Sequence, residues 1–241
     1  MVLPLANTPI ILLDIEGTTT PVDYVFGVLF PFAAQHLETF LTEQGQDSAV
    51  QEDLKTLWED YQQDMSQGLG VPLWNWGAAI EAQSYVQYLI AHDRKATGLK
   101  SLQGKIWEAG YEGGQLRSQI FPDVAPALHR WVSQGKALYI FSSGSVQAQQ
   151  SLFRHTEAGD LTGLLQGYFD TRVGSKRDPS SYQAIATAIG ADPETICFIS
   201  DVVEELQAAQ AVGFEVLLSV RSPEVPPNAQ GFTIVTTFEG L

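Results

Sequence analysis

Two carboxylates directly follow an apolar segment near the start of the chain. Asp14 and Glu16 come after Ile10–Leu13, a wholly apolar run of the type found in buried strands. In open α/β sheets, ligands bind beyond the carboxyl ends of the strands, so chemistry is expected where these acids lie. A backbone that stays extended through Ile15 would aim both carboxylates to the same side. The segment therefore predicts an acidic edge suited to catalysis or metal binding.

The residues after Glu16 are suited to a tight turn. Gly17 allows the chain to reverse sharply, and Thr18 offers a hydroxyl and an amide to an anion. The alternative interpretation is that the acids only cap a turn between a strand and a helix. Because short motifs also match by chance, the remainder of the chain must decide.

A serine-rich turn is the second candidate element. Ser142 and Ser143 follow the apolar run Ala137–Phe141, and Val146 opens a helical pattern. The start of a helix presents free amides and the positive end of the helix dipole, so this turn is suited to an anion such as phosphate. A plain serine N-cap is the alternative for this segment.

Lys176 is the third element. It lies shortly before Pro179, a typical first residue of a helix, and would place an ammonium beside a phosphate and an aspartate. Most lysines lie on the solvated surface, which is the alternative for this residue. Along the chain it lies between the serine turn and the next acidic strand end.

A second acidic strand end completes the set. Asp201 follows the apolar run Ile196–Ser200 just as Asp14 follows the first run. Adjacent parallel strands lie about 4.8 Å apart, so these carboxylates would repel each other unless a cation such as Mg²⁺ bridges them. Glu205 is placed to orient a metal-bound water or a lysine, and Glu204 to face solvent. The alternative is that these acids complement a helix dipole.

The charge of the chain limits its partners. The 241 residues include 13 Lys and Arg against 28 Asp and Glu, a formal net charge of −15 at pH 7. Such a chain repels nucleic acid and anionic membranes, so we expect neither as a partner. A phosphorylated ligand therefore requires local positive charge, which a divalent metal held by carboxylates, together with a lysine, would supply.

The remaining composition is typical of a soluble globular protein. Hydrophobic residues make up 44% of the chain, enough for a sizeable core. The single cysteine, Cys197, lies in an apolar run and cannot form an internal disulfide, which fits a reducing cytoplasm. The segment Met1–Leu13 shows no secretory signal, and no run approaches the ~20 apolar residues that span a membrane. We expect a cytoplasmic protein.

Hydrophobic periodicity divides the chain into two parts. Between Tyr24 and Arg117 the pattern is helical, and one helix face carries Leu54, Leu57, Trp58 and Tyr61. From Phe121 onward, helical and strand patterns alternate. Helices are expected over Val124–Val132 and around Ile185 and Ile189, and strands over Ala137–Phe141, Ile196–Ser200 and Phe214–Val220. Such alternation predicts a parallel sheet with helices on both faces, which the first strand joins.

These motifs resemble a known superfamily. Asp14–Thr18 resembles the first motif of the haloacid dehalogenase superfamily, Asp-x-Asp-x-Thr, with Glu16 in place of the second aspartate. The longer stretch to Pro21, followed by Val28–Pro31, is similar to the enolase-phosphatases of methionine salvage. The resemblance covers nearly the whole chain and includes Leu102–Gly104, Phe121–Val124, Tyr139–Val146 and Gly174–Lys176.

The resemblance implies an α/β fold, a Rossmann-like parallel sheet core with an inserted helical cap. The core would comprise residues 1–20 and 118–241, and the cap residues 21–117. The implied enzyme is a Mg²⁺-dependent phosphomonoester hydrolase with enolase activity. Its substrate would be 2,3-diketo-5-methylthiopentyl-1-phosphate, first enolised and then dephosphorylated to acireductone and phosphate. We expect a monomer with one Mg²⁺ per subunit and this small phosphorylated metabolite as its partner.

The resemblance also implies a role for each candidate residue. Asp14 would attack phosphorus, or at least ligate the metal beside it. Glu16 would handle the proton of the leaving group and lend an oxygen to Mg²⁺, and Asp201 would complete the metal site. The phosphate would be held by Ser142, Ser143 and Lys176.

Two other functions stay open at this point. The same fold and chemistry would serve another small phosphomonoester, in which case Glu16 is a neutral variation. The alternative outside enzymes is a regulator that binds a phosphorylated metabolite without turnover, against which Asp14, Lys176 and Asp201 argue.

An aromatic segment is a candidate for recognising the substrate's sulfur. Leu73–Trp76 contains two tryptophans, and thioethers pack well against aromatic rings. Tryptophans in a helical domain more often belong to its core, which is the alternative interpretation.

Overall fold

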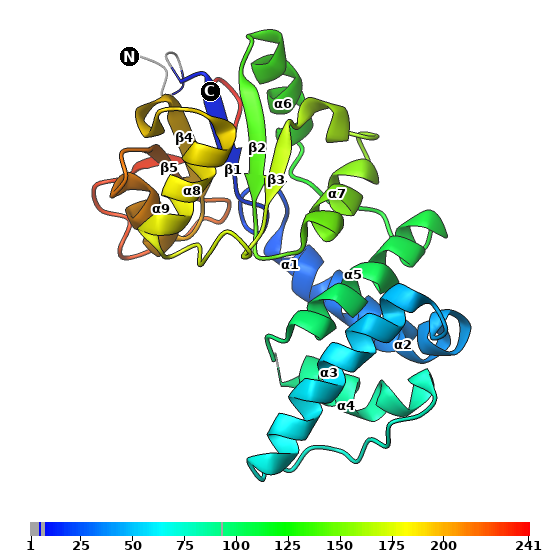
Figure 1. Cartoon of the computed structure of the whole chain (residues 1–241). Helices are drawn as coiled ribbons and strands as arrows, with labels where there is room; N and C mark the ends of the chain where they lie inside the picture. The colour runs from blue at the N-terminus through cyan, green and yellow to red at the C-terminus, as the bar shows by residue number, and fades with distance from the viewer. Residues whose placement is uncertain (1–4, 6–7, 93) are drawn as a thin grey trace. The chain divides into compact units, whose positions relative to one another are not determined.

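The computed structural model describes residues 5, 8–92 and 94–241. Contacts within the chain divide it into two compact units (Figure 1). One unit comprises Met1–Tyr24 and Arg117–Leu241, and the other is the intervening segment Val25–Leu116. The chain therefore leaves the first unit after its first strand and later returns to complete it.

A six-stranded parallel sheet forms the centre of the first unit, with the strand order β3-β2-β1-β4-β5-β6 (Figure 1). The strands are β1 (Ile10–Leu13), β2 (Ala137–Phe141), β3 (Gly167–Phe169), β4 (Ile196–Ser200), β5 (Glu215–Ser219) and β6 (Thr233–Val235). Leu13 at the end of β1 lies opposite Ile140 of β2 and Ile199 of β4. The carboxyl ends of these three strands therefore meet at one edge of the sheet.

Helices cover both faces of the sheet (Figure 1). Those on one face are α6 (Val124–Ser133) and α7 (Val146–Arg154), and those on the other are α8 (Pro179–Ile189) and α9 (Val203–Gln210). Side chains of β1 alternate between the two faces, as a strand requires. Ile11 and Leu13 belong to the core beneath α6 and α7, whereas Leu12 belongs to the core beneath α8 and α9.

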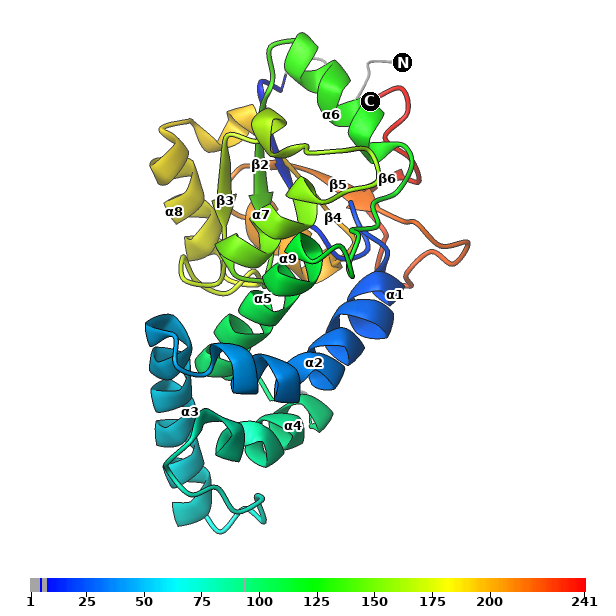
Figure 2. The same ribbon diagram turned by 90° about the vertical axis from the view of Figure 1, so that its right-hand side faces the viewer.

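The C-terminal segment after β6 returns to α6 (Figure 2). Arg130 of α6 donates to the carbonyl of Phe238 at 2.6 Å and to that of Leu241 at 3.3 Å. The indole of Trp131 also donates to the carbonyl of Leu241, at 3.1 Å. These bonds hold the C-terminal segment against α6, which packs on one face of the sheet.

The second unit is helical and has its own apolar core. Its longer helices are α2 (Phe30–Gln44), α3 (Ser48–Ser66), α4 (Gln83–Ala91) and α5 (Thr97–Glu112), preceded by a π-helical turn over Val25–Leu29. In α3, Leu54, Leu57 and Tyr61 are buried, as the periodicity predicts. The Asp47 side chain caps this helix by accepting a hydrogen bond from the Ala49 amide at 2.8 Å.

The predicted parallel sheet with helices on both faces is confirmed. The strands expected over 10–13, 137–141 and 196–200 have those bounds, and the strand expected over 214–220 is shorter by one residue at each end. Two edge strands, β3 and β6, have no counterpart among the sequence predictions. Each has three residues, too few for a two-residue alternation to be recognised.

The aromatic segment of the helical unit divides between core and surface. Trp74 is buried in the core, whereas Leu73 and Trp76 are exposed. The four residues therefore do not form one continuous wall, and Trp74 follows the core interpretation. Across the described residues, no helix combines the length and apolar character that crossing a membrane demands.

Leucines of the helical unit offer a matched test of its core. The Leu57 side chain is 0% exposed and that of Leu73 is 79% exposed. Leu57→Ala is expected to lower the free energy of unfolding by about 2–5 kcal/mol because it leaves a cavity. Leu73→Ala is expected to change it by less than about 0.5 kcal/mol. Urea unfolding followed by circular dichroism measures both, and equal losses would contradict the assigned core.

Candidate active site

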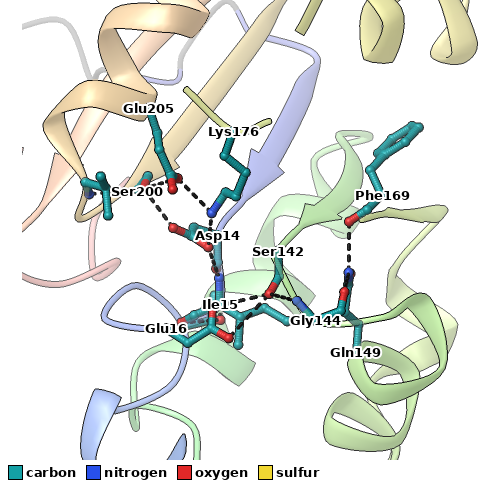
Figure 3. Close-up of polar contacts among 12 residues, drawn as sticks. Asp14, Ile15, Glu16, Ser142, Gly144, Gln149, Phe169, Lys176, Ser200 and Glu205 are labelled. Atoms are coloured by element: carbon teal, nitrogen blue, oxygen red, sulfur yellow. Dashed lines mark hydrogen bonds and ion pairs between the residues drawn. The ribbon is translucent and has the colours of Figure 1, made fainter. Parts of the chain in front are cut away.

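Candidate residues from distant parts of the chain meet at one edge of the sheet (Figure 3). Asp14 follows β1, Ser142 follows β2, and Asp201 follows β4. Since β1 pairs with both other strands, the structure brings these three positions side by side. The prediction that Asp14 and Asp201 leave neighbouring parallel strands is confirmed.

Asp14 lies at the centre of this group and is 2% exposed (Figure 3). Its Oδ1 lies 2.6 Å from the Nζ of Lys176 and accepts a hydrogen bond from the Ile15 amide at 2.7 Å. Its Oδ2 lies 2.8 Å from the hydroxyl of Ser200. Both carboxylate oxygens are therefore engaged, and the carboxylate is held in one orientation.

Lys176 bridges two acids from inside the protein. Its Nζ lies 2.6 Å from Asp14 and 2.7 Å from the Oε2 of Glu205. The hydroxyl of Tyr182, on α8, donates to the carbonyl of Lys176 at 2.7 Å and fixes the loop that carries it. Burial lowers the pKa of the ammonium, but the two carboxylates outweigh burial and raise it. The lysine therefore remains charged.

Glu205 lies in the first turn of α9 and faces the same lysine. Its carboxylate also lies 3.1 Å from the hydroxyl of Ser200. Burial raises the pKa of Glu205 to about 7, and the charge of Asp14 adds to the effect. The Ser200 hydroxyl has a single proton, so it donates to only one of Asp14 and Glu205 at a time. Glu204, by contrast, is exposed as predicted.

Glu16 lies beside Asp14 and faces the serine turn. The hydroxyl of Ser142 lies 3.2 Å from one oxygen of Glu16 and 3.4 Å from the other. Burial raises the pKa of Glu16, and the neighbouring charge of Asp14 raises it further. The structure thus brings both acids of the first motif into one cluster.

The chain makes a tight turn directly after Glu16. The carbonyl of Ile15 accepts hydrogen bonds from the amides of Thr18, Thr19 and Thr20 at 3.2, 2.9 and 2.9 Å. The Thr18 amide, a candidate donor to an anion, is therefore used within the turn. The Thr18 hydroxyl is buried and has no hydrogen-bond partner within the described part of the chain.

Gly17 leaves room for Asp201. Its φ is +71°, and a Cβ atom built there would lie 2.1 Å from the Oδ2 of Asp201. The carboxylate therefore packs against the bare glycine backbone. Burial raises the pKa of Asp201 to about 7, with the charge of Asp14 as the next contribution.

The serine turn joins β2 to α7, as predicted. Ser142 is buried and accepts a hydrogen bond from the Gly144 amide at 3.2 Å, whereas Ser143 is exposed. Ser145, rather than either of these, caps the helix by accepting from the Ala148 amide at 3.2 Å. Ser142 and Ser143 are thereby left outside the helix, on the side where β2 ends.

Gln149 braces this turn from within α7 (Figure 3). The amide nitrogen of its side chain donates to the carbonyls of Gly144 and Phe169, each at 2.8 Å. Neither Gln149 nor Ser200 was among the predicted site residues. The available signal is a glutamine at the spacing of the buried stripe Leu152 and Phe153, where an apolar residue is expected.

The donor set fits a hard divalent cation. Lys176 forms ion pairs with two of the four clustered carboxylates, Asp14 and Glu205. Burial, together with the nearby charge of Asp14, raises the pKa of Asp201. Within the described ranges, no three His, Cys, Asp or Glu side chains form a ready-made metal cage. Mg²⁺ does not require one, since it binds one or two carboxylates together with waters and a substrate phosphate.

Comparison with known proteins places this geometry in a family. Residues 8–213 match the model of the haloacid dehalogenase-like hydrolases. The chain is 51% identical to enolase-phosphatase E1 of Synechococcus elongatus, over 100% of both chains. It is 43% identical to enolase-phosphatase E1 of Pseudomonas fluorescens, over 96% of both.

A solved structure agrees with these relatives. The crystal structure of the UTR4 protein of Saccharomyces cerevisiae superposes with a TM-score of 0.78 at 32% identity, covering 98% of this chain and 100% of that one. The similarity extends through both compact units, because it spans nearly the entire chain. The protein therefore belongs to the haloacid dehalogenase-like hydrolases and, within them, to the enolase-phosphatase E1 family.

Proposed function

We propose that this protein is a bifunctional enolase-phosphatase of methionine salvage, which converts 2,3-diketo-5-methylthiopentyl-1-phosphate to acireductone and phosphate. The observation that carries the proposal is the buried pair of Asp14 and Lys176, with Glu16 beside it at the converging strand ends. Full-length similarity to enolase-phosphatases supports the same assignment.

Asp14 is the nucleophile of the phosphatase step. One of its oxygens attacks phosphorus, and the bond between phosphorus and the substrate oxygen breaks. Glu16 gives its proton to that departing oxygen, and water then cleaves the aspartyl phosphate to release inorganic phosphate. The oriented carboxylate of Asp14 and the position of Glu16 beside it support these roles.

Enolisation precedes this step and uses the same part of the substrate. A base removes a proton from C1, the carbon that bears the phosphate ester. The electron pair forms a double bond between C1 and C2, the C2 oxygen takes a proton from water, and the base keeps the C1 proton for the departing oxygen of the next step. Because the base must lie within a few ångströms of the oxygen that later leaves, we assign this role to Glu16 as well.

We assign the binding of phosphate to Ser142, Ser143 and Lys176. The lysine supplies a buried positive charge, and the serine turn supplies hydroxyl and amide donors at the start of α7. In a chain with a net charge of −15, this local arrangement offsets the general repulsion of an anionic substrate.

Asp14 and Asp201, with an oxygen of Glu16, are the residues that would hold one Mg²⁺. The metal would supply charge neutralisation for the phosphate and the acids around it. Gly17 serves this arrangement by leaving space for the Asp201 carboxylate.

We also propose a domain division, a location, an oligomeric state and a set of partners for the enzyme. The helical cap domain, residues 21–117, is inserted after the first strand, and the compact unit Val25–Leu116 supports this division. The enzyme works in the cytoplasm as a monomer. It has the small phosphorylated metabolite as its partner, and neither nucleic acid nor a membrane.

Two substitutions separate the two reactions. Asp14→Asn is expected to retain some enolisation, provided that Mg²⁺ still binds, and to accumulate the enol phosphate because the nucleophile is missing. Glu16→Gln is expected to slow both steps, by a factor of about 10²–10⁴ if it removes the acid–base group. Ultraviolet spectra of diketone, enol phosphate and acireductone follow the first step, and phosphate release follows the second.

The outcomes of this experiment are distinct. Enolisation by Glu16→Gln at the wild-type rate would show that another group is the base. Wild-type enzyme that releases phosphate from a panel of phosphomonoesters but not from the diketone would favour a different small substrate. Binding without any turnover would favour a regulator.

Metal removal tests the assigned ligands. A chelator is expected to abolish phosphate release, and added Mg²⁺ to restore it, because buried carboxylates and phosphate otherwise repel each other. Ca²⁺ is expected to replace Mg²⁺ poorly, since it prefers looser and higher coordination. Full activity of the wild-type enzyme in metal-free buffer, measured by phosphate release, would refute the metal site.

Gly17 and Gly190 provide a matched pair of substitutions. Both have a positive φ, +71° and +75°, but a Cβ at Gly190 meets no atom within 4 Å. Alanine at either position is expected to cost about 1–2 kcal/mol of backbone strain. Only Gly17→Ala is expected to lower turnover as well, by at least about tenfold, because it displaces Asp201. Thermal melts and phosphate release measure the two effects, and equal turnover in both variants would argue against the role of Asp201.

A further inference from the structure

Arg221 contacts the turn of the first motif from outside the candidate site. It follows β5, and its side chain is 8% exposed. Its Nε and Nη2 both donate to the carbonyl of Thr18, at 3.0 and 2.9 Å. Thr18 lies two residues after Glu16 and one after Gly17. The guanidinium of Arg221 therefore holds the turn at Thr18, just after the catalytic acids in the sequence.

The guanidinium lies between two aromatic rings. Its central carbon is 4.6 Å from the ring centre of Phe121 and 4.3 Å from that of Phe238. Its Nη1 forms an ion pair with the Oδ2 of Asp123 at 2.7 Å. Such a slot fits the planar, forked guanidinium and leaves it little freedom to rotate.

Asp123 links the Arg221 guanidinium to the C-terminal segment. Its Oδ2 also accepts hydrogen bonds from the Phe238 amide at 2.5 Å and from the Thr237 hydroxyl at 3.2 Å. Burial raises the pKa of this carboxyl, but the bonds from Phe238 and Arg221 outweigh burial and lower it. The acid therefore stays ionised as the partner of Arg221.

Besides Arg221, the Phe121 amide reaches the turn from outside, donating to the Thr19 carbonyl at 3.0 Å. The bonds from Thr18, Thr19 and Thr20 to the Ile15 carbonyl are internal to the turn. From β5, the Ser219 hydroxyl reaches the Gly17 carbonyl only at 3.4 Å. Arg221 provides two bonds to the Thr18 carbonyl, at 3.0 and 2.9 Å, and among the side-chain donors to the turn it is the charged one.

We propose that Arg221 is a positioning residue for the reaction, which holds the Thr18 carbonyl and thereby places Glu16 and Gly17 against Asp14 and Asp201. It touches neither phosphate nor the reacting atoms, so it acts through the turn. The inference rests on the proposed roles of Asp14 and Glu16. It adds that the C-terminal segment, through Asp123 and Phe238, is part of the support of the catalytic acids.

This role predicts a specific division of kinetic effects. Lys176 and the serine turn bind phosphate, and Arg221 contacts neither of them. Loss of the forked contact shifts the catalytic acids while leaving the phosphate donors in place. Turnover is therefore expected to fall, whereas the affinity for phosphate is expected to stay nearly constant.

The test compares Arg221→Lys with Arg130→Lys. Arg130 also binds the C-terminal segment, at the carbonyls of Phe238 and Leu241, but it is not bonded to the turn. Arg221→Lys is expected to lower kcat at least about tenfold, with KM and the inhibition constant of inorganic phosphate changed less than about twofold. Arg130→Lys is expected to lower Tm while leaving kcat within about twofold of wild type.

A second measurement does not depend on activity. Hydrogen–deuterium exchange of the peptide that contains Thr18, Thr19 and Thr20 is expected to be faster in Arg221→Lys than in wild type, and unchanged in Arg130→Lys. If Arg221→Lys does not fold, Asp123→Asn loosens the same guanidinium more gently. It is expected to lower kcat by about threefold without changing KM.

Three results would overturn the proposal. The first is wild-type kcat and wild-type exchange in Arg221→Lys. The second is an equal loss of kcat in the two arginine variants, which would indicate general destabilisation. The third is a rise in the phosphate inhibition constant as large as the fall in kcat. Failure of the wild-type enzyme to release phosphate would instead contradict the proposed function, and the exchange experiment would still decide the contact made by Arg221.

Discussion

The buried ammonium of Lys176 is the interaction on which the site depends. Carboxylates this deep in a protein are costly unless a positive charge faces them. Lys176 lies between Asp14 and Glu205, and the Ser200 hydroxyl lies within hydrogen-bond distance of both acids. Removal of this charge would leave Asp14 next to uncompensated acids. The orientation of Asp14 and the charge balance among its acidic neighbours therefore depend on one side chain, as does phosphate binding in the proposed mechanism.

The sequence predicted the candidate site best where its residues directly follow a predicted strand. Asp14, Ser142 and Asp201 each follow an apolar run of four or five residues, and adjacent parallel strands bring such positions together. For that reason the sheet and the cluster of candidate residues could be predicted. The presence of Lys176 in the cluster followed from its place between two such elements along the chain.

The supporting residues could not be predicted in the same way. Gln149 and Arg221 act through backbone carbonyls that lie 5, 20 and 203 residues away along the chain, and any residue type offers a carbonyl. Nothing in local composition marks which carbonyl receives them. A sharp turn at Gly17 was predicted, but the bonds of three amides to the Ile15 carbonyl were not, because alternation of side chains describes strands and not the hydrogen bonds of a turn. The short strands β3 and β6 depend on pairing at the sheet's edges rather than on their own pattern.

The position of β1 also has a consequence for how the chain acquires its structure. This strand is made first, yet its two neighbours in the sheet, β2 and β4, begin at Ala137 and Ile196. During synthesis, the four apolar residues of β1 and the two acids after it therefore lack neighbouring strands until most of the chain has left the ribosome. Contacts over such separations form slowly, and unpaired strands invite association with other chains. The intervening helical unit has its own core and can fold in that interval, so the short segment before it is the part most exposed to misassembly.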